Sequence, residues 1–159
     1  MYLFAGSFWI GAVVGDDTLV SVGADGWQHC NEMHPDESPQ GNIIYRSILN
    51  PGQPEYENAV SEQDYIAVYT DTFTSGAPNL CEDYLDDRLH IPLNIEVTQS
   101  SYAWSYLFAE DFVIFDYKIK NIGEQTLNDV YMGIYVDGDV YGLTNPSGFE
   151  DDITGFIHT

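Results

Sequence analysis

The stretch DFVIFDYKIKNIGEQTLNDVYMGIYVDGD, from Asp111 to Asp139, decides the fold that the sequence predicts. Before its polar centre, apolar side chains stand at every second position, at Val113, Phe115, Tyr117 and Ile119. After the centre the same alternation returns, at Val130, Met132, Ile134 and Val136. A period of two is typical of a β-strand with one buried face. We therefore expect two long strands, joined at residues 121–126, that pair as antiparallel neighbours over a common core.

The N-terminal segment predicts a β-hairpin. Residues 2–14 and 18–24 are apolar or alternating, and they flank the turn sequence Gly15-Asp16-Asp17. Short turn-forming residues between two strand-like runs are the usual signal for a hairpin. Residues 64–72, DYIAVYTDT, resume strand character later in the chain.

Residues 91–106 form a strand whose apolar phase changes partway along. Apolar side chains occupy odd positions as far as Val97 and even positions from Tyr102 onward. A β-bulge inserts one residue into a strand and shifts its phase by one. We therefore expect a bulge between Thr98 and Ser101.

The chain as a whole predicts an all-β protein. Its 159 residues are enough for a single domain with a real core. Several strands are separated by turn-rich stretches, no helical pattern alternates with them, and residues 28–62 form a long connection. We expect one antiparallel β-sandwich over residues 1–159, Ig-like or jelly-roll-like, with long loops.

Charge excludes several functions. The chain has 4 Lys and Arg against 26 Asp and Glu, a formal net charge of −22. Such a surface repels phosphate backbones and anionic lipids, so we expect no nucleic-acid partner and no binding to a membrane surface. The apolar run at residues 1–15 is shorter than the about 20 residues that span a bilayer, so we expect no membrane insertion. The imbalance favours cation binding, or simply solubility in a salty medium.

The two cysteines, Cys30 and Cys81, both lie in loop-like sequence. An extracellular location would allow them to form the one intramolecular disulfide that two cysteines permit. Spacing alone does not show that the two residues meet, so pairing and two free thiols both stay open. His29, His34, Glu32 and Asp36 surround Cys30, but their irregular spacing matches no zinc motif.

Acidic residues cluster where the second long strand ends. Asp137 and Asp139 end that strand, and the cluster continues with Glu150, Asp151 and Asp152. Calcium binds six to eight hard oxygens, and carboxylates at strand ends supply them. An EF-hand loop is excluded, because Tyr141 and Gly148 would stand at its fifth and twelfth positions. We expect a Ca²⁺ site of another geometry here; the alternative is a solvated acidic loop.

Aromatic residues form a second candidate site. Tyr102, Trp104 and Tyr106 share one parity and would stack on sugar rings if they were exposed. The alternative is burial in the core, where aromatic side chains are equally common.

We expect no catalytic activity. The sequence has no nucleophile elbow and no glycine-rich phosphate loop. A pair of carboxylates for glycoside hydrolysis arises by chance among so many acids.

The segment EDFVIFDYKIKNIGEQTLNDVYMGIYVDGDV resembles the strand pair of Ig-like, CARDB-type adhesion and surface modules. More of the chain resembles uncharacterised large secreted bacterial surface proteins of the sorting-domain type. The segments that carry this resemblance are GSFWIGAVVGDDTLVSVGADGW, SEQDYIAVYTDT, IPLNIEVTQSSYAWSY and DDITGF. The resemblance implies export and a multidomain parent, of which this chain is a fragment or module. The family has no activity to carry over.

These observations predict a non-catalytic, extracellular or cell-surface module with a structural or adhesive role, stabilised by calcium. Its expected partners are other surface proteins, neighbouring domains or glycans. Two alternatives stay open. One is a carbohydrate-binding module of a secreted polysaccharide-active protein, and the other is a surface or filament subunit that self-associates through exposed strand edges.

Overall fold

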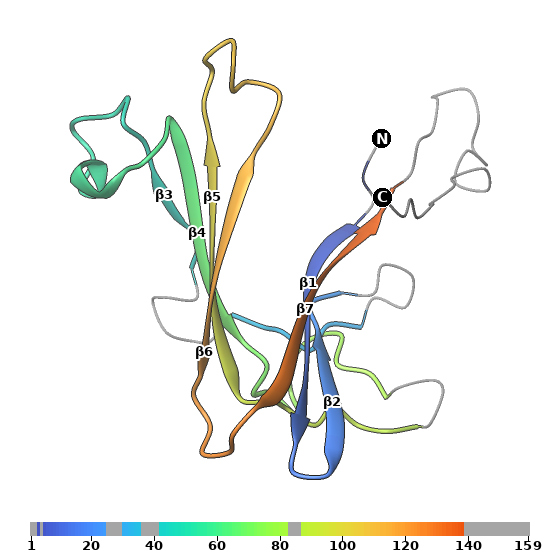
Figure 1. The fold of residues 1–159 in the computed structure, drawn as a ribbon. Coiled ribbons are helices and arrows are strands. Elements are labelled where there is room, and N and C mark those ends of the chain that lie inside the picture. Colours follow the sequence, from blue (N-terminus) through green and yellow to red (C-terminus); the bar gives the residue numbers. More distant parts are fainter. Residues whose placement is uncertain (1–2, 4, 25–29, 36–41, 83–86, 139–159) are drawn as a thin grey trace. The chain divides into compact units, whose positions relative to one another are not determined.

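The computed structural model describes residues 3, 5–24, 30–35, 42–82 and 87–138. This part of the chain contains seven β-strands and the single-turn 3₁₀ helix η2 (Tyr56–Asn58), and it has no α-helix. The strands form two sheets, and every pairing in them is antiparallel (Figure 1). The predicted all-β, antiparallel class is confirmed, and two such sheets are consistent with a β-sandwich.

The chain divides into two compact units, and each contains one sheet. Unit 1 consists of Met1–Glu32, Thr74–Ile91 and Leu127–Thr159. Unit 2 consists of Met33–Phe73 and Pro92–Thr126.

Unit 1 contains the three-stranded sheet A, in the order β2-β1-β7. Its strands are β1 (Ala5–Val14), β2 (Asp17–Val22) and β7 (Asn128–Asp137). Strands β1 and β2 pair antiparallel as far as Val14 and Asp17, so the predicted hairpin is confirmed. Gly15 lies in the turn with a φ of 64°, a left-handed conformation that glycine adopts without strain.

Alternate side chains of the hairpin provide the core of unit 1. Phe8, Ile10 and Ala12 of β1 are buried, as is Leu19 of β2, which lies opposite Ala12. On the other face of the sheet, the Trp9 ring stacks on Tyr135 of β7 with centroids 5.3 Å apart. The period-two pattern of the sequence therefore defines the two faces of the hairpin.

Unit 2 contains the four-stranded sheet B, in the order β3-β4-β5-β6. Its strands are β3 (Ile44–Arg46), β4 (Gln63–Thr70), β5 (Ile95–Ala103) and β6 (Ile114–Asn121). Strand β5 is central, and its residues 96–103 pair with β4 on one side. On its other side β5 pairs with β6.

The predicted hairpin between the two long strands of residues 111–139 is wrong. Strand β6 pairs with β5 in sheet B, whereas β7 pairs with β1 in sheet A. The connection after β6 explains why no hairpin forms, because the amides of Ile122 and Gly123 donate to the carbonyl of Asn94. A Cβ at Gly123 would lie only 2.8 Å from Asn94 Cβ, so this segment packs closely on the loop before β5.

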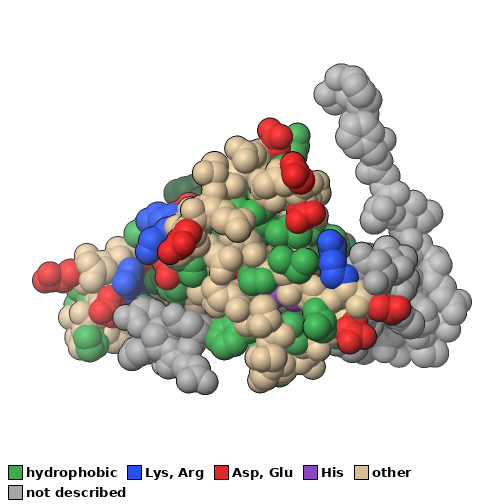
Figure 2. All heavy atoms as spheres, turned by 90° about the horizontal axis from the view of Figure 1, so that it is seen from below, with side chains coloured by type: hydrophobic (Ala, Val, Ile, Leu, Met, Phe, Trp, Pro, Cys, Tyr) green, Lys and Arg blue, Asp and Glu red, His purple; other side chains and the backbone are tan. Residues whose placement is uncertain are grey.

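The predicted common core of these two strands is also wrong. Val113, Phe115, Val130, Met132, Ile134 and Val136 are all exposed. Figure 2 shows apolar side chains lying open at the surface between acidic ones. The buried hydrophobic core comes from other strands and loops, including Ile10, Leu93, Ile95 and Val97. Both β6 and β7 lie at sheet edges, where a strand has a neighbour on one side only.

The predicted bulge between Thr98 and Ser101 is wrong as well, because β5 keeps a constant register with both neighbours. The apolar phase changes because Ile95 and Val97 lie on one face of β5 and Tyr102 lies on the other. A register shift occurs instead between β1 and β7, at Gly11 and Val13 of β1. Asp129 of β7 has a φ of 45° there, a conformation that Asp tolerates better than most residues.

Candidate functional site

The two faces of sheet B differ completely in charge. Residues that pair across antiparallel strands share a face, so the register assigns each strand residue to one side of the sheet. One face, which we call the uncharged face, has no Asp, Glu, Lys or Arg in the four strands. The opposite, charged face carries Arg46, Asp64, Glu96, Asp116, Lys118 and Lys120.

Aromatic rings lie in a row across the uncharged face. The register places Tyr45, Tyr65, Ser101 and Phe115 side by side on the four strands. The three aromatic residues are 38%, 43% and 54% exposed, in that order. The rings of Tyr45 and Tyr65 are 5.5 Å apart. The small Ser101 of β5 therefore separates the Tyr45–Tyr65 pair from Phe115. The axes of β4 and β6, the strands on either side of β5, are about 10 Å apart.

The next row of the uncharged face is polar as well as aromatic. It contains Ala67, Gln99 and Tyr117, and the Tyr117 ring is 6.4 Å from that of Phe115. The Tyr69 hydroxyl donates to Gln99 Oε1 over 3.0 Å. At the other end of the face, Gln63 Nε2 donates to the Tyr65 hydroxyl over 3.2 Å.

Two tyrosines of this face have raised pKa values. Burial raises the pKa of Tyr69 above its ordinary value, and the nearby Tyr117 adds to the effect. Burial alone raises the pKa of Tyr117. These raised pKa values keep the hydroxyls of Tyr69 and Tyr117 protonated in more alkaline conditions than an ordinary tyrosine, whose pKa is about 10. Such a face offers rings, hydroxyls and amides to a neutral ligand, and no acid–base pair.

Two buried carboxylates hold β4, the second strand of sheet B. Asp64 is 1% exposed and Asp71 is 0% exposed. Asp64 accepts hydrogen bonds from the amides of Val60 and Ser61, both 2.8 Å long, and another from the Ser61 hydroxyl. Asp71 lies just beyond the strand and accepts from the amides of Leu93 and Ile95, at 2.7 and 2.8 Å. These bonds hold β4 at both of its ends.

Sequence reasoning missed these carboxylates because it considered acids as functional groups only in the C-terminal cluster and around Cys30. A signal was present, since Asp64 shares its parity with Ile66 and Val68. An acid in phase with apolar strand residues points to a buried, hydrogen-bonded carboxylate.

The aromatic residues predicted as a sugar platform do not share one strand face. Tyr102 lies in β5 on the charged face, opposite Asp64 and Ile114. Trp104 and Tyr106 follow the end of the strand, and the Tyr106 ring stacks on Phe108 at 5.5 Å. Tyr102 and Trp104 are half-buried, whereas Tyr106 is exposed.

Of the residues predicted to bind calcium, Asp137 ends β7. Asp139, Glu150, Asp151 and Asp152 lie outside the described residues. Within the described ranges, no group of three or more His, Cys, Asp or Glu residues is placed to hold a metal ion.

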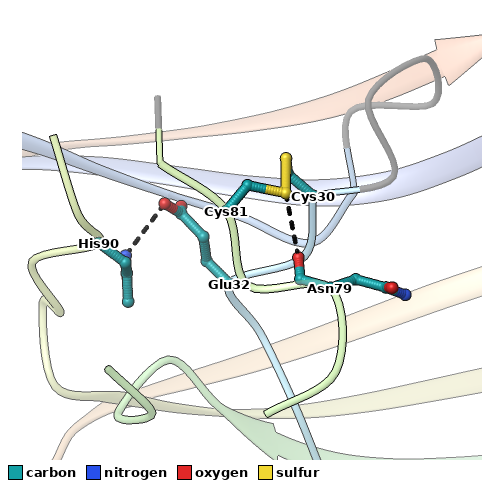
Figure 3. Close-up of a disulfide and its surroundings, with 5 residues drawn as sticks. All are labelled: Cys30, Glu32, Asn79, Cys81 and His90. Atoms are coloured by element: carbon teal, nitrogen blue, oxygen red, sulfur yellow. Dashed lines mark hydrogen bonds and ion pairs between the residues drawn. A yellow bond between two sulfur atoms is a disulfide. The ribbon is translucent and has the colours of Figure 1, made fainter. Parts of the chain in front are cut away.

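Cys30 and Cys81 form a disulfide in unit 1, with their Cα atoms 5.5 Å apart (Figure 3). Cys81 Sγ lies 3.5 Å from the Asn79 carbonyl oxygen, a contact rather than a hydrogen bond because a disulfide sulfur has no proton. Nearby, Nδ1 of the buried His90 lies 3.1 Å from Glu32 Oε1. The other oxygen of Glu32 accepts from the Val22 amide. The loops around the disulfide are thus joined to the end of β2.

No helix in the described part of the chain is long and apolar enough to cross a membrane. Comparison with protein-family models, with curated proteins and with solved structures finds no match to this chain.

Proposed function

We propose that the chain is a non-catalytic module of an extracellular or cell-surface protein, with a structural or adhesive role. The observation that carries this proposal is the uncharged face of sheet B. In a chain of net charge −22, this face exposes Tyr45, Tyr65 and Phe115 without one charged strand residue beside them. Exposed aromatic surface of this kind is typical of a contact site.

The disulfide supports an extracellular location. Disulfides persist in oxidising compartments and are rare in the cytosol. The Cys30–Cys81 bond joins loops that are 51 residues apart in the sequence, as a structural disulfide does. The strongly acidic surface is compatible with a salty external medium, where self-repulsion is screened.

The test of an adhesive role is binding by the whole chain to immobilised neutral glycans and surface proteins, measured by surface plasmon resonance. We expect the double variant Tyr65→Ala/Phe115→Ala to weaken binding about tenfold or more, the effect of losing two buried aromatic contacts. Tyr106→Ala is the matched control, because it removes an exposed ring outside the uncharged face. Equal losses in both variants, or no binding at all, would count against this role for the face.

Carbohydrate binding is the second candidate function, and the chemistry of the uncharged face favours it. Sugars present flat arrays of C–H groups that pack on aromatic rings, and hydroxyls that bond to amides and phenols. Tyr65 and Phe115 stand on either side of Ser101, and Gln99 lies in the next row. A neutral polysaccharide suits this face better than an anionic one, which the net charge of −22 would repel.

Affinity electrophoresis in gels containing single polysaccharides separates this candidate from protein adhesion. Retardation by a neutral glycan that disappears in the Tyr65→Ala variant would support it, and retention of protein ligands alone would reject it. Reducing-sugar release from the same glycans tests the non-catalytic part of the proposal. Steady release over time would overturn that part.

Calcium stabilisation stays part of the proposal. Asp137 and the neighbouring acids supply oxygens of the kind that Ca²⁺ prefers. Thermal melts with Ca²⁺ and with a chelator test it, and we expect a higher midpoint with Ca²⁺. Magnesium at the same ionic strength is the control, and identical midpoints in all three conditions would remove calcium from the proposal.

A further inference from the structure

The four edge strands of the two sheets differ in how their open edges are protected. Exposed edges invite pairing with other chains, and proteins block them with short strands, charges or covering segments. Strand β3 has only three residues and contains Arg46. Strand β6 carries Asp116, Lys118 and Lys120. At the end of β2, both backbone groups of Val22 bond to Glu32.

Within the described residues, strand β7 has none of these protections apart from the register shift beside Asp129 at its start. It is ten residues long, and no charged residue lies between Asp129 and Asp137. Its apolar and aromatic side chains Val130, Tyr131, Met132, Ile134 and Val136 are 45–76% exposed. Only β1 pairs with it among the described strands, so alternate backbone groups of β7 point to an open edge.

The sequence of β7 is nearly a palindrome. Residues 129–137 read DVYMGIYVD, and the reversed sequence differs only by exchanging Met132 and Ile134. If two copies pair antiparallel about Gly133, each Val130 meets a Val136, each Tyr131 meets a Tyr135 and each Met132 meets an Ile134. Such a strand is complementary to itself across a two-fold axis, the commonest symmetry of homodimers.

We propose that two copies of this chain pair through β7, so that their A sheets join as β2-β1-β7-β7-β1-β2. Two copies of a protein with a net charge of −22 repel each other, but along β7 they would meet through uncharged residues. Like charges approach each other only at its ends, where Asp129 of one copy, left-handed at the register shift, lies near Asp137 of the other. Salt screens this repulsion, so dimerisation strengthens as ionic strength rises.

The contact is small, since each copy contributes a single strand. It lies at the weak end of specific interfaces, below about 1,200 Å² of buried surface. The dimer therefore forms in a concentration-dependent equilibrium. The pairing uses sheet A alone and does not rest on the uncharged face of sheet B, so the two proposals fail independently.

Sedimentation of the whole chain over a concentration series, in low and in high NaCl, tests the proposal. We expect the average mass to rise from 17.9 kDa toward that of a dimer, and to rise further in high salt. Removing the charges with Asp129→Asn/Asp137→Asn should tighten the dimer about threefold to tenfold at low salt. Asn tolerates the left-handed backbone at position 129 as Asp does.

Tyr131→Asp should weaken the dimer about tenfold or more, because it disrupts two symmetric tyrosine pairs and adds charge to the edge. Phe115→Asp is the matched control, since it makes the same kind of change on the exposed edge β6. Circular dichroism establishes whether the two Asp variants fold. The tighter dimer expected of Asp129→Asn/Asp137→Asn is a separate test that does not depend on these variants. A monomer at all concentrations in high salt, equal effects of both Asp variants, or open-ended oligomers would overturn the proposal.

Discussion

Strands β6 and β7 have nearly the same alternation of apolar residues, yet they lie at the edges of different sheets. The edge of β6 bears Asp116, Lys118 and Lys120, whereas β7 is uncharged between its terminal aspartates. Alternation determines which side chains share a face, and it does not determine the partner strand. In the proposed dimer, the charges along an edge decide whether it stays single or accepts another strand.

The two units also differ in how their loops are held. In unit 1 the Cys30–Cys81 disulfide joins the loops covalently, and the Glu32–His90 contact lies beside it. In unit 2 the buried carboxylates of Asp64 and Asp71 hold the loops by accepting hydrogen bonds from backbone amides. Removing the disulfide or a buried carboxylate and measuring the free energy of unfolding shows how much each kind of anchor contributes to stability.

The largest expected effect is loss of the disulfide in unit 1. The bond closes a loop of 51 residues, for which chain entropy predicts a loss of about 4 kcal/mol of unfolding free energy in Cys30→Ser/Cys81→Ser. Urea denaturation of the oxidised protein and the variant measures it. Reductant should destabilise only the protein that has both cysteines, and an unchanged midpoint in the variant would contradict the prediction.

Loss of the Asp71 carboxylate in unit 2 comes next. Asp71→Ala leaves the buried amides of Leu93 and Ile95 without these acceptors, and we expect a loss of about 3 kcal/mol. The control is Asp116→Ala on the exposed edge of β6, with an expected change below about 0.5 kcal/mol. Similar losses from the two substitutions in urea would mean that Asp71 is not an anchor.

A smaller effect is expected at alkaline pH, and it is specific to sheet B. The pKa of Tyr69 and that of Tyr117 are raised in the folded protein, chiefly by burial. Their stabilising effect is complete below about pH 10, the ordinary tyrosine pKa, and is lost as pH rises through the folded values. Thermal melts at increasing pH should show this loss, with a smaller loss in Tyr69→Phe. An equal loss in that variant would assign the effect to other groups.

The smallest expected effect on stability is removal of the lysine charges of β6. Lys120 lies 3.7 Å from Glu96 at an exposed site, and such pairs contribute about 0–1 kcal/mol. Lys118→Thr/Lys120→Thr should therefore melt almost as the parent protein does, while its mass in sedimentation rises with concentration beyond that of the parent. Lys118→Arg/Lys120→Arg is the control that keeps the edge charged. Unchanged association of the Thr variant would show that lysine does not protect this edge.

Features that depend on neighbouring residues were predictable from the sequence. The strands and the β1–β2 hairpin follow from period-two alternation and from the turn at Gly15. The choice of partner was not predictable in the same way. Residues 121–126 look like a hairpin connection, but the amides of Ile122 and Gly123 bond to Asn94, which is distant in the sequence.

The candidate site shows the same division. Parity alone grouped Tyr102 with Trp104 and Tyr106, whereas Tyr45, Tyr65 and Phe115 come together only through the register of four strands. Asp64 and Asp71 were hidden among 26 acidic residues, because composition does not distinguish a solvated carboxylate from one that accepts buried amides.

The disulfide also determines how the chain would respond to mechanical load. Strands β3 and β4 lie within the loop that Cys30 and Cys81 close. Tension along the chain passes across the sulfur–sulfur bond and does not extend the loop that contains these strands. At about 3.4 Å per residue, the bond withholds about 170 Å of extensible chain, which reduction would release. A pulling force on this protein would therefore meet a shorter tether in an oxidising medium than in a reducing one.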